Sequence, residues 1–443
     1  MTDLSTDARV AGVHVQSIQR DGKRTDLATN IMLGVLVAGA TFALYWASSF
    51  VLHARTATTH FGADSWYYAE LAQGYIFARL PSNYYLDRVT RFHPTTVGLA
   101  AAWMHVFQPL TQWIAPLHIL KAMFAAVGAA GALAAVWAFA AFVPRRTALV
   151  LGMIYATSFG VWYFASFEES KIVTATLSTL YIAGYLHLRK TWTAHGAALL
   201  TAVLLLACLN EMTAGFLVII PVIDTLTRYG WSWRKGRWIV AHALAGPAAF
   251  IIIEGVIFGR LVATTHPEGT SHFGMLFYYI ARNYYSLDVL YAFVANWWFF
   301  NIAAPTVDAM YQVPVGANYK GYFEPSLLNY LKSPASVGVA MSFCALVVAS
   351  ALPRFRPNDR GGMAVDNLSG LLLALLAFTM LRAVFFFVFN PAEPLLFSPT
   401  VTLPHLLILA IPFMMSKVPA KPFLLAAVCI LLFVANGAFI IGR

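Results

Sequence analysis

The sequence predicts an all-α integral membrane protein with about eleven transmembrane helices. Its composition is the first reason, because 60% of the 443 residues are hydrophobic and only 11% are charged, whereas soluble domains carry about 25% charged residues. The second is that apolar runs near the length of a bilayer crossing recur along the chain between short polar connectors. These features exclude disordered, collagen-like and disulfide-built secreted proteins.

The apolar runs define one transmembrane domain over 31–443, preceded by a polar tail over 1–30. The run at 31–52 lacks a cleavage signal after a short apolar region, so we expect an uncleaved first helix with a cytoplasmic N-terminus. Ten further runs complete the expected bundle. They cover 117–142, 148–166, 172–188, 197–209, 213–226, 239–258, 334–353, 367–389, 401–415 and 422–441.

Charge alternates between successive connectors, and Lys and Arg are enriched in cytoplasmic loops. We therefore place the basic connectors inside and the acidic or polar ones outside. The basic ones contain Arg145-Arg146, Arg189-Lys190, Arg228 with Arg234-Lys235 and Arg237, Arg354 with Arg356 and Arg360, and Lys417 with Lys421; the acidic or polar ones contain Glu168-Glu169, Asn210-Glu211 and 390–393. This pattern accounts for most of the net charge of +10 without nucleic-acid binding.

The moderately apolar stretch at 95–107 is too short to cross a bilayer, and counting it as a span would invert the charge pattern after it. We expect a re-entrant or juxtamembrane helix there, within a large extracytoplasmic loop over 53–116. A second large extracytoplasmic loop covers 259–333. Its many aromatic residues, including those at 297–300, suit helices that lie at the membrane interface.

Ionisable residues crowd into the first of these loops. They are Asp64, Glu70, Asp87, Arg88, Arg91 and His93. Gly62 allows a turn, and apolar residues from Trp66 to Phe77 recur near helical spacing, so a helix is expected to start at Asp64. Its carboxylate could cap that helix or act as a catalytic base, and the two roles are compatible.

Two motifs in this loop resemble the GT-C superfamily of polytopic glycosyltransferases. They are Asp64-Ser-Trp-Tyr-Tyr and Phe92-His93-Pro94-Thr-Thr-Val-Gly-Leu. In that superfamily an acidic residue follows the first span, and a His-Pro or Pro-Pro element leads into an apolar helix. A further acidic position in the next outer loop corresponds to Glu168-Glu169. The similarity covers roughly the first 230 residues, with His93-Pro94-Thr95 in place of the commoner double proline.

The resemblance implies an inverting transferase that moves a sugar from a polyprenyl-phosphate-linked donor to an acceptor hydroxyl of a glycan, lipid or protein. The site would face the extracytoplasmic side of a membrane, which we expect to be a bacterial inner membrane. The chemistry requires a base for the hydroxyl proton and cations for the departing phosphate. Asp64 is the candidate base, and Arg88, Arg91, His93 and Arg382 are the candidate phosphate ligands.

Arg382 lies within an apolar run, where a charge is costly and marks a function or a buried partner. It could instead reach the interface or pair with Glu393. Glu393, Glu168 and Glu169 are candidate substrate-binding residues, although the Glu pair could also solvate a turn, and Lys171 beside it could be a rim charge. No cofactor is expected with certainty; a divalent metal ion is conceivable, but no metal-ligand spacing supports one.

Two other functions are compatible with the sequence. A secondary transporter would concentrate acidic residues near the middle of the membrane and show internal repeats, whereas the acids here lie in outer loops. A non-catalytic GT-C-like subunit of a membrane complex would not need Asp64. The connector Asn210-Glu211 is expected to form a cap or turn, and Asp224 a helix pair with Arg228 four residues later.

Overall fold

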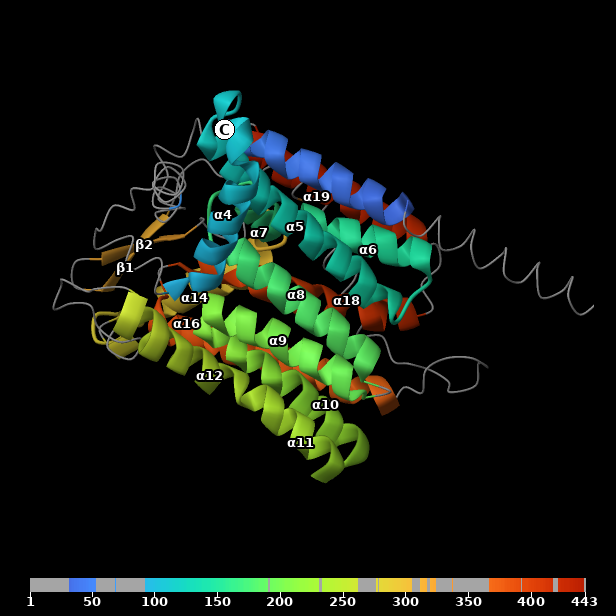
Figure 1. Ribbon diagram of the computed structural model, residues 1–443. Helices are drawn as coiled ribbons and strands as arrows, with labels where there is room; N and C mark the ends of the chain where they lie inside the picture. Colours follow the sequence, from blue (N-terminus) through green and yellow to red (C-terminus); the bar gives the residue numbers. More distant parts are fainter. Residues whose placement is uncertain are drawn as a thin grey trace, which may run out of the picture.

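The computed structural model describes residues 32–52, 68, 92–189, 192–230, 233–261, 276–277, 279–304, 311–316, 319–323, 337, 366–391, 393–416 and 421–441. Over these residues the chain is predominantly helical (Figure 1), and it includes one antiparallel pair of strands, β1 (Tyr311–Gly316) and β2 (Tyr319–Phe323). Six described helical segments are long and apolar enough to cross a membrane, and a bent pair makes up to seven. The helical membrane class is therefore confirmed at this level.

The six segments are Met32–Leu52, α5 (Pro116–Ala140), Ile239–Val256, Leu368–Phe389 in α16 (Asp366–Phe389), Pro394–Met415 and Lys421–Ile440 in α19 (Lys421–Ile441). The bent pair is α6 (Arg145–Thr157) with α7 (Phe159–Ala165). The other described elements are α4 (Pro94–Phe107), η2 (Gln108–Gln112), α8 (Lys171–Leu188), α9 (Ala194–Asn210), η3 (Met212–Val218), α10 (Ile219–Tyr229), α11 (Trp233–Ala243), α12 (Ala245–Ile251), η4 (Ile252–Leu261), α14 (Leu287–Val294), η5 (Ala295–Phe300), α17 (Pro394–Phe397), η7 (Ser398–Val401) and α18 (Thr402–Met415).

These elements agree closely with the predicted apolar runs. The run at 95–107 forms the short helix α4, as expected. The runs at 172–188 and 197–209 form α8 and α9, which are helical but are not among the segments long and apolar enough to cross a membrane. The predicted span at 334–353 lies outside the described residues except for residue 337, as do 53–67 and 69–91 of the first predicted outer loop and 262–275, 278, 305–310, 317–318 and 324–333 of the second.

Charged residues mark the two ends of the helix bundle. Lys171 at the start of α8 pairs with Glu211 just after α9, whereas Arg189 just after α8 pairs with Asp224 in α10. We call these the Glu211 end and the Asp224 end. In Figure 1 the Glu211 end lies to the left, where α4, α14 and the β1–β2 pair gather.

The bend of 64° between α6 and α7 is produced by a second segment that contacts the break. The N–H groups of Phe159 and Gly160 donate to the carbonyls of Ile302 and Asn301, at 2.9 and 2.8 Å, instead of continuing the helix. A glycine is required at position 160, because a Cβ there would lie 2.2 Å from Oδ1 of Asn301. The bend redirects α7 and so determines where the connector after it begins.

Asn436 of α19 satisfies backbone groups both at the end of α6 and in the segment that contacts the break. Its amide nitrogen donates to the carbonyls of Thr157, at 2.6 Å, and Ile302, at 3.0 Å, while its Oδ1 accepts from the N–H of Ala304 at 2.7 Å. A membrane interior offers no water to these groups, so an irregular backbone there needs partners from the protein itself.

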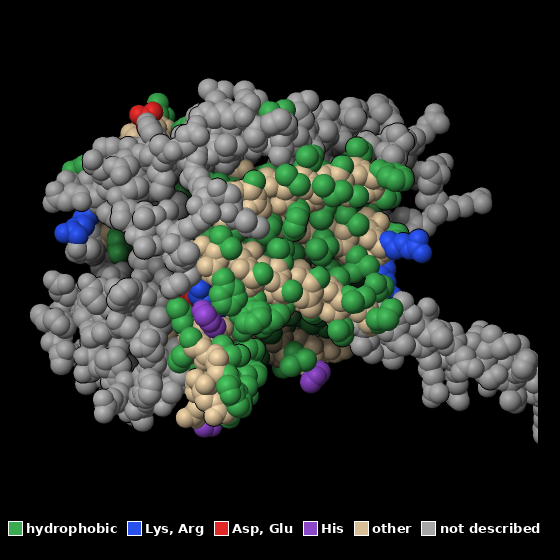
Figure 2. Space-filling model, turned by 90° about the horizontal axis from the view of Figure 1, so that it is seen from above, with side chains coloured by type: hydrophobic (Ala, Val, Ile, Leu, Met, Phe, Trp, Pro, Cys, Tyr) green, Lys and Arg blue, Asp and Glu red, His purple; other side chains and the backbone are tan. Residues whose placement is uncertain are grey.

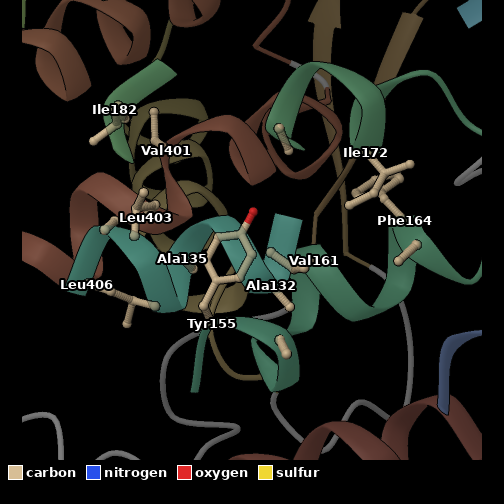
Figure 3. Packing of buried hydrophobic residues seen from close by; sticks show 14 of the residues in the cluster. Ala132, Ala135, Tyr155, Val161, Phe164, Ile172, Ile182, Val401, Leu403 and Leu406 are labelled. Carbon is tan, nitrogen blue, oxygen red and sulfur yellow. The ribbon is translucent and has the colours of Figure 1, made fainter. Parts of the chain in front are cut away.

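The core packs α5, α6, α7 and α8 against η7 and α18, as Figure 3 shows around Tyr155. The Tyr155 hydroxyl lies 3.0 Å from Oγ1 of Thr179 on α8, so the ring fills the core while its polar atom is satisfied. Small residues on α5 allow α8 to pack close against it. A Cβ at Gly131 would lie 2.7 Å from Oγ1 of Thr176.

Outside this core, hydrophobic side chains face outward from the bundle. Figure 2 shows them, with exposed backbone, over the described middle of one face, while most of the Lys and Arg side chains visible there lie toward its left and right edges. Val35, Trp137, Ile251 and Phe423 are among the exposed large apolar residues. Such a continuous apolar surface suits contact with lipid rather than water.

We expect Gly128→Ala to lower the thermal stability of the protein in detergent, at a cost of about 1–3 kcal/mol from overpacking. A Cβ at Gly128 would lie 2.5 Å from Cβ of Ala165 and 3.0 Å from the ring of Tyr45. Gly39→Ala is the matched control, because it makes the same change within the helix Met32–Leu52 where nothing lies within 4 Å. Equal melting temperatures for the two variants would contradict the packing argument.

Candidate functional site

The Glu211 end holds a group of buried ionisable side chains contributed by five parts of the chain. We call this group the Glu211 cluster; its members are Lys121, Glu168, Glu169, Lys171, Glu211 and Arg382. The exposed fractions of Glu168, Glu169 and Arg382 are only 2%, 1% and 0%. Charges are rarely buried unless they are paired, so their partners define the site.

Glu211 binds two cations from different helices. One carboxylate oxygen, Oε1, lies 2.6 Å from Nη2 of Arg382, and the other, Oε2, lies 3.5 Å from Nζ of Lys171. Thr213 connects the pair further, since its hydroxyl donates to Oε1 of Glu211 at 2.5 Å and accepts from Nη1 of Arg382 at 3.0 Å. Two cations therefore share one carboxylate, while Nε of Arg382 is buried without a hydrogen-bond partner.

Aromatic rings hold both cations in place. The guanidinium of Arg382 lies 5.0 Å from the ring centre of Phe386, one helical turn later on α16. The ammonium of Lys171 lies 4.5 Å from the ring centre of Phe397 on α17. Cation–π contacts of this kind contribute about 0.5–2 kcal/mol, with the larger values at desolvated sites.

The carboxylates of the cluster differ in proton affinity. Burial alone would raise the pKa of Glu211, but the charges of Arg382 and Lys171 outweigh it and lower that pKa to about 2. Burial raises the pKa of Glu168, and the charge of Lys121 only partly offsets it. Glu211 is thus a permanent anion at physiological pH and a poor base.

Lys121 joins the cluster to the first helix. Its Nζ donates to the carbonyl of Ser49 at 2.7 Å and lies 3.7 Å from Oε1 of Glu168. Glu169 accepts at Oε1 from both the N–H and the hydroxyl of Ser170, each at 3.0 Å. The connector at 166–170 is therefore held from several sides and is not a solvated turn.

Asn210 links the start of α4 to α8 and α9. Its Oδ1 accepts from the N–H and the hydroxyl of Thr96, at 2.9 and 2.6 Å. Its Nδ2 donates to the carbonyl of Ser170 at 3.1 Å and to Oγ1 of Thr174 at 2.8 Å. Its backbone carbonyl lies 2.7 Å from Nδ1 of His93. One buried amide therefore places His93 at the same end of the bundle as the cluster.

The structure brings together some of the residues singled out from the sequence. His93, Glu168, Glu169 and Arg382 all lie at the Glu211 end. Glu393 accepts at Oε2 from Nδ2 of Asn390 at 2.7 Å. Asp64, Arg88 and Arg91 lie outside the described residues. In the loop over 53–91 only Tyr68 is described, and its buried ring contacts that of Phe124 on α5 at 5.7 Å between centres.

Three expectations need correction. Arg382 pairs with Glu211 and not with Glu393, because η3, which begins directly after Glu211, packs against α16. Asn210 and Glu211 are more than a cap or turn, since both are buried and bind side chains of other helices. Lys171 is buried rather than a rim charge. One signal could have identified this group: a charge within an apolar run requires an opposite charge at the same depth.

The Asp224 end carries a different charge network. The predicted pair of Asp224 with Arg228 is confirmed at 3.0 Å, and Arg189 adds a two-point contact at 2.7 and 3.0 Å. The Tyr185 hydroxyl also donates to Asp224. Both oxygens of Asp224 are satisfied, which indicates a structural role in fixing α8 against α10.

Among the described residues no three His, Cys, Asp or Glu side chains lie together as a metal site would require. Comparison with known protein families and with curated protein sequences finds no match to this chain. The function is therefore inferred from the charge pattern, the two motifs of the first predicted outer loop and the geometry of the Glu211 cluster.

We expect Glu211→Gln to destabilise the protein more than Arg382→Met. The first change leaves two buried cations without their carboxylate. Breaking a buried ion pair in this way costs about 3–5 kcal/mol of stability. The second still leaves Lys171 paired with Glu211. Melting temperatures in detergent measure the difference, with Glu393→Gln as a control outside the cluster. A larger drop in melting temperature for Arg382→Met than for Glu211→Gln would contradict this interpretation of the ion pairs.

Proposed function

We propose that this protein is a membrane glycosyltransferase that moves a sugar from a polyprenyl-phosphate-linked donor to an acceptor hydroxyl of a glycan, lipid or protein on the extracytoplasmic face. In this proposal the chain is of the GT-C kind, crosses a bacterial inner membrane about eleven times and keeps its N-terminus in the cytoplasm. Asp64 acts as the general base, and the configuration at the sugar carbon inverts.

The distribution of charge supports this orientation. Three basic residues belong to the Asp224 end: Arg145 at the start of α6, Arg189 just after α8 and Arg228 near the end of α10. Because Lys and Arg are enriched on the cytoplasmic side, the Glu211 end is then extracytoplasmic. His93, Glu168 and Glu169 share that end, where the first outer loop of the proposed topology also returns to the bundle.

The observation that carries the proposal is the buried guanidinium of Arg382 beside Glu211. Two buried cations, Lys171 and Arg382, contact a single carboxylate, and Nε of Arg382 lacks a hydrogen-bond partner. Arg382 lies seven residues before the end of α16, about 10 Å along the helix axis. A lipid phosphate at that depth would accept a hydrogen bond from this Nε, because the guanidinium fork suits phosphate oxygens.

Each residue has a distinct role in the proposed reaction. Asp64 takes the proton of the acceptor hydroxyl as its oxygen bonds to the sugar carbon. The bond from that carbon to the phosphate oxygen breaks, and the lipid phosphate leaves with one more negative charge. Arg88, Arg91, His93 and Arg382 would stabilise that charge, while Glu168, Glu169 and Glu393 would bind the sugar or acceptor. Electrostatic stabilisation of developing charge is often the largest single contribution to catalysis.

We expect Asp64→Asn to abolish sugar transfer while leaving folding and membrane level unchanged. General-base catalysis contributes about 10²–10⁴-fold to rate. The assay uses proteoliposomes with a panel of polyprenyl-phosphate-linked sugars and measures new glycosidic bonds. Asp87→Asn, the same change in the same loop, is the control that should retain transfer. Wild-type activity in Asp64→Asn would refute the base, and sugar crossing the bilayer without bond formation would indicate a transporter.

We expect Arg382→Lys to weaken the apparent affinity for the lipid-linked donor by on the order of tenfold, because Lys keeps the charge but loses the second donor of the fork. Arg189→Lys is the matched control, since it makes the same change in a buried ion pair at the opposite end of the bundle. Donor saturation curves of the two folded variants provide the comparison. Equal donor affinities would exclude Arg382 from the phosphate site.

A further inference from the structure

Lys171 is a buried cation whose N–H donors are not all used. Its Nζ lies 3.5 Å from Oε2 of Glu211 and 4.5 Å from the ring centre of Phe397. The contact with Glu211 is not a hydrogen bond, because that Oε2 has no hydrogen-bond partner. An ammonium has three donors in a tetrahedral arrangement, so one carboxylate and one ring face leave at least one of them without an acceptor. Among the described residues Lys171 therefore has an ion pair and a cation–π contact but no hydrogen bond.

Lys121, the other lysine of the Glu211 cluster, has the acceptor that Lys171 lacks. Its Nζ donates to the carbonyl of Ser49 at 2.7 Å and lies 3.7 Å from Oε1 of Glu168. Both lysines are almost completely buried. Burying a charged donor without an acceptor costs free energy. The incomplete set of partners at Lys171 thus indicates an acceptor that the described residues do not supply.

Lys171 also stands at an unfavourable position for a cation. It is the first residue of α8, where the positive end of the helix dipole disfavours a positive charge. The first turn of α8 contains no acidic residue, and the side chain of Ser170 does not cap the helix. Glu211, in the connector after α9, is an anion that faces this end. A second anion bound beside it would be stabilised by both the ammonium and the helix N-terminus.

Two stacked phenylalanine rings place Lys171 beside Arg382. The rings of Phe386 and Phe397 lie 4.0 Å apart between their centres, with an angle of 15° between their planes. Arg382 contacts the first ring and Lys171 the second. Each cation also contacts a different oxygen of Glu211. Two cations that share one carboxylate in this way are close enough to share the oxygens of one phosphate.

Arg382 also keeps a donor that is not used. Its Nη2 donates to Oε1 of Glu211 at 2.6 Å, and its Nη1 donates to the hydroxyl of Thr213 at 3.0 Å. The terminal edge of the guanidinium is therefore filled, whereas the buried Nε has no hydrogen-bond partner. Lys171 and Arg382, held by the same carboxylate and the same pair of rings, each retain an N–H donor.

We propose that Lys171 is a second phosphate-binding residue, which donates to one oxygen of the lipid-linked phosphate while Nε of Arg382 donates to another. The inference deepens the proposed function and rests on it. A phosphodiester has two oxygens outside its ester bonds, one for each cation, and it gains a further negative charge when the sugar leaves. Donors already fixed by Glu211 and the stacked rings stabilise that charge without rearrangement. The ligand chemistry is a phosphate carried by a polyprenyl chain.

Four variants test this role. Lys171→Met removes the ammonium but keeps an unbranched side chain that packs against Phe397, and it should fold because Glu211 stays paired with Arg382. Lys171→Gln is a second neutral variant, and Lys171→Arg restores a charge with N–H donors. Lys121→Met is the comparison, since it removes the other buried ammonium of the cluster. Melting temperatures establish that each variant is folded before binding is compared.

The experiment measures the Kd of polyprenyl phosphate and of polyprenol for the full chain in nanodiscs. The ratio of the polyprenol Kd to the polyprenyl phosphate Kd reports recognition of the phosphate, because a disturbance of lipid-chain binding affects both ligands. We expect Lys171→Met and Lys171→Gln to lower this ratio by on the order of tenfold or more, as the loss of a charged hydrogen bond predicts. Lys121→Met should lower it much less, and Lys171→Arg should restore most of it. Inorganic phosphate should bind more weakly than polyprenyl phosphate.

Several results would overturn the inference. A wild-type ratio in Lys171→Met would exclude Lys171 from the phosphate site and leave the proposed function intact. Equal losses in Lys171→Met and Lys121→Met would assign the effect to the charge of the cluster as a whole. Inorganic phosphate that binds as tightly as polyprenyl phosphate would identify a site for the free ion. If the wild type binds polyprenyl phosphate no better than polyprenol, the proposed donor class fails as well.

Discussion

The ion pair between Glu211 and Arg382 is the contact on which the Glu211 end of the bundle depends. Its two atoms lie 2.6 Å apart, and the arginine is fully buried. A charge at that depth is tolerated only with a partner, so the connector after α9 and the C-terminal part of α16 cannot slide past each other without exposing an uncompensated charge. Lys171 extends the same constraint to the start of α8.

A second constraint is the supply of hydrogen-bond partners where the backbone is irregular. The break between α6 and α7 frees polar groups, and these are bound by Asn301, Ile302 and Asn436 from distant parts of the chain. The break also ends α6 early and redirects α7, after which the connector carrying Glu168 and Glu169 reaches Lys121. The packing of this irregular segment therefore places acidic side chains of the candidate site.

Some residues of the candidate site could be identified from the sequence, and others could not. An arginine inside an apolar run is conspicuous, so Arg382 was identified from the sequence as functional or paired. Its partner was not, because Glu211 follows an ordinary apolar helix and resembles a capping residue in one dimension. Asn210 was interpreted in the same way, although its amide joins three segments that are far apart in the chain. Side-chain identity gives no indication of such contacts between distant segments.

The amino-acid sequence alone determined the membrane class, most helix positions and the alternation of basic and acidic connectors, since each depends on local composition and on the thickness of a bilayer. It also determined the local pair of Asp224 with Arg228, whose spacing of four residues places them on one helix face. Only the tertiary structure decided that Arg382 meets Glu211, that Lys121 meets Glu168 and that the backbone carbonyl of Asn210 meets Nδ1 of His93. Those contacts depend on how each helix is positioned along the bundle axis relative to its neighbours. The shapes of the apolar side chains that pack between the helices set that position.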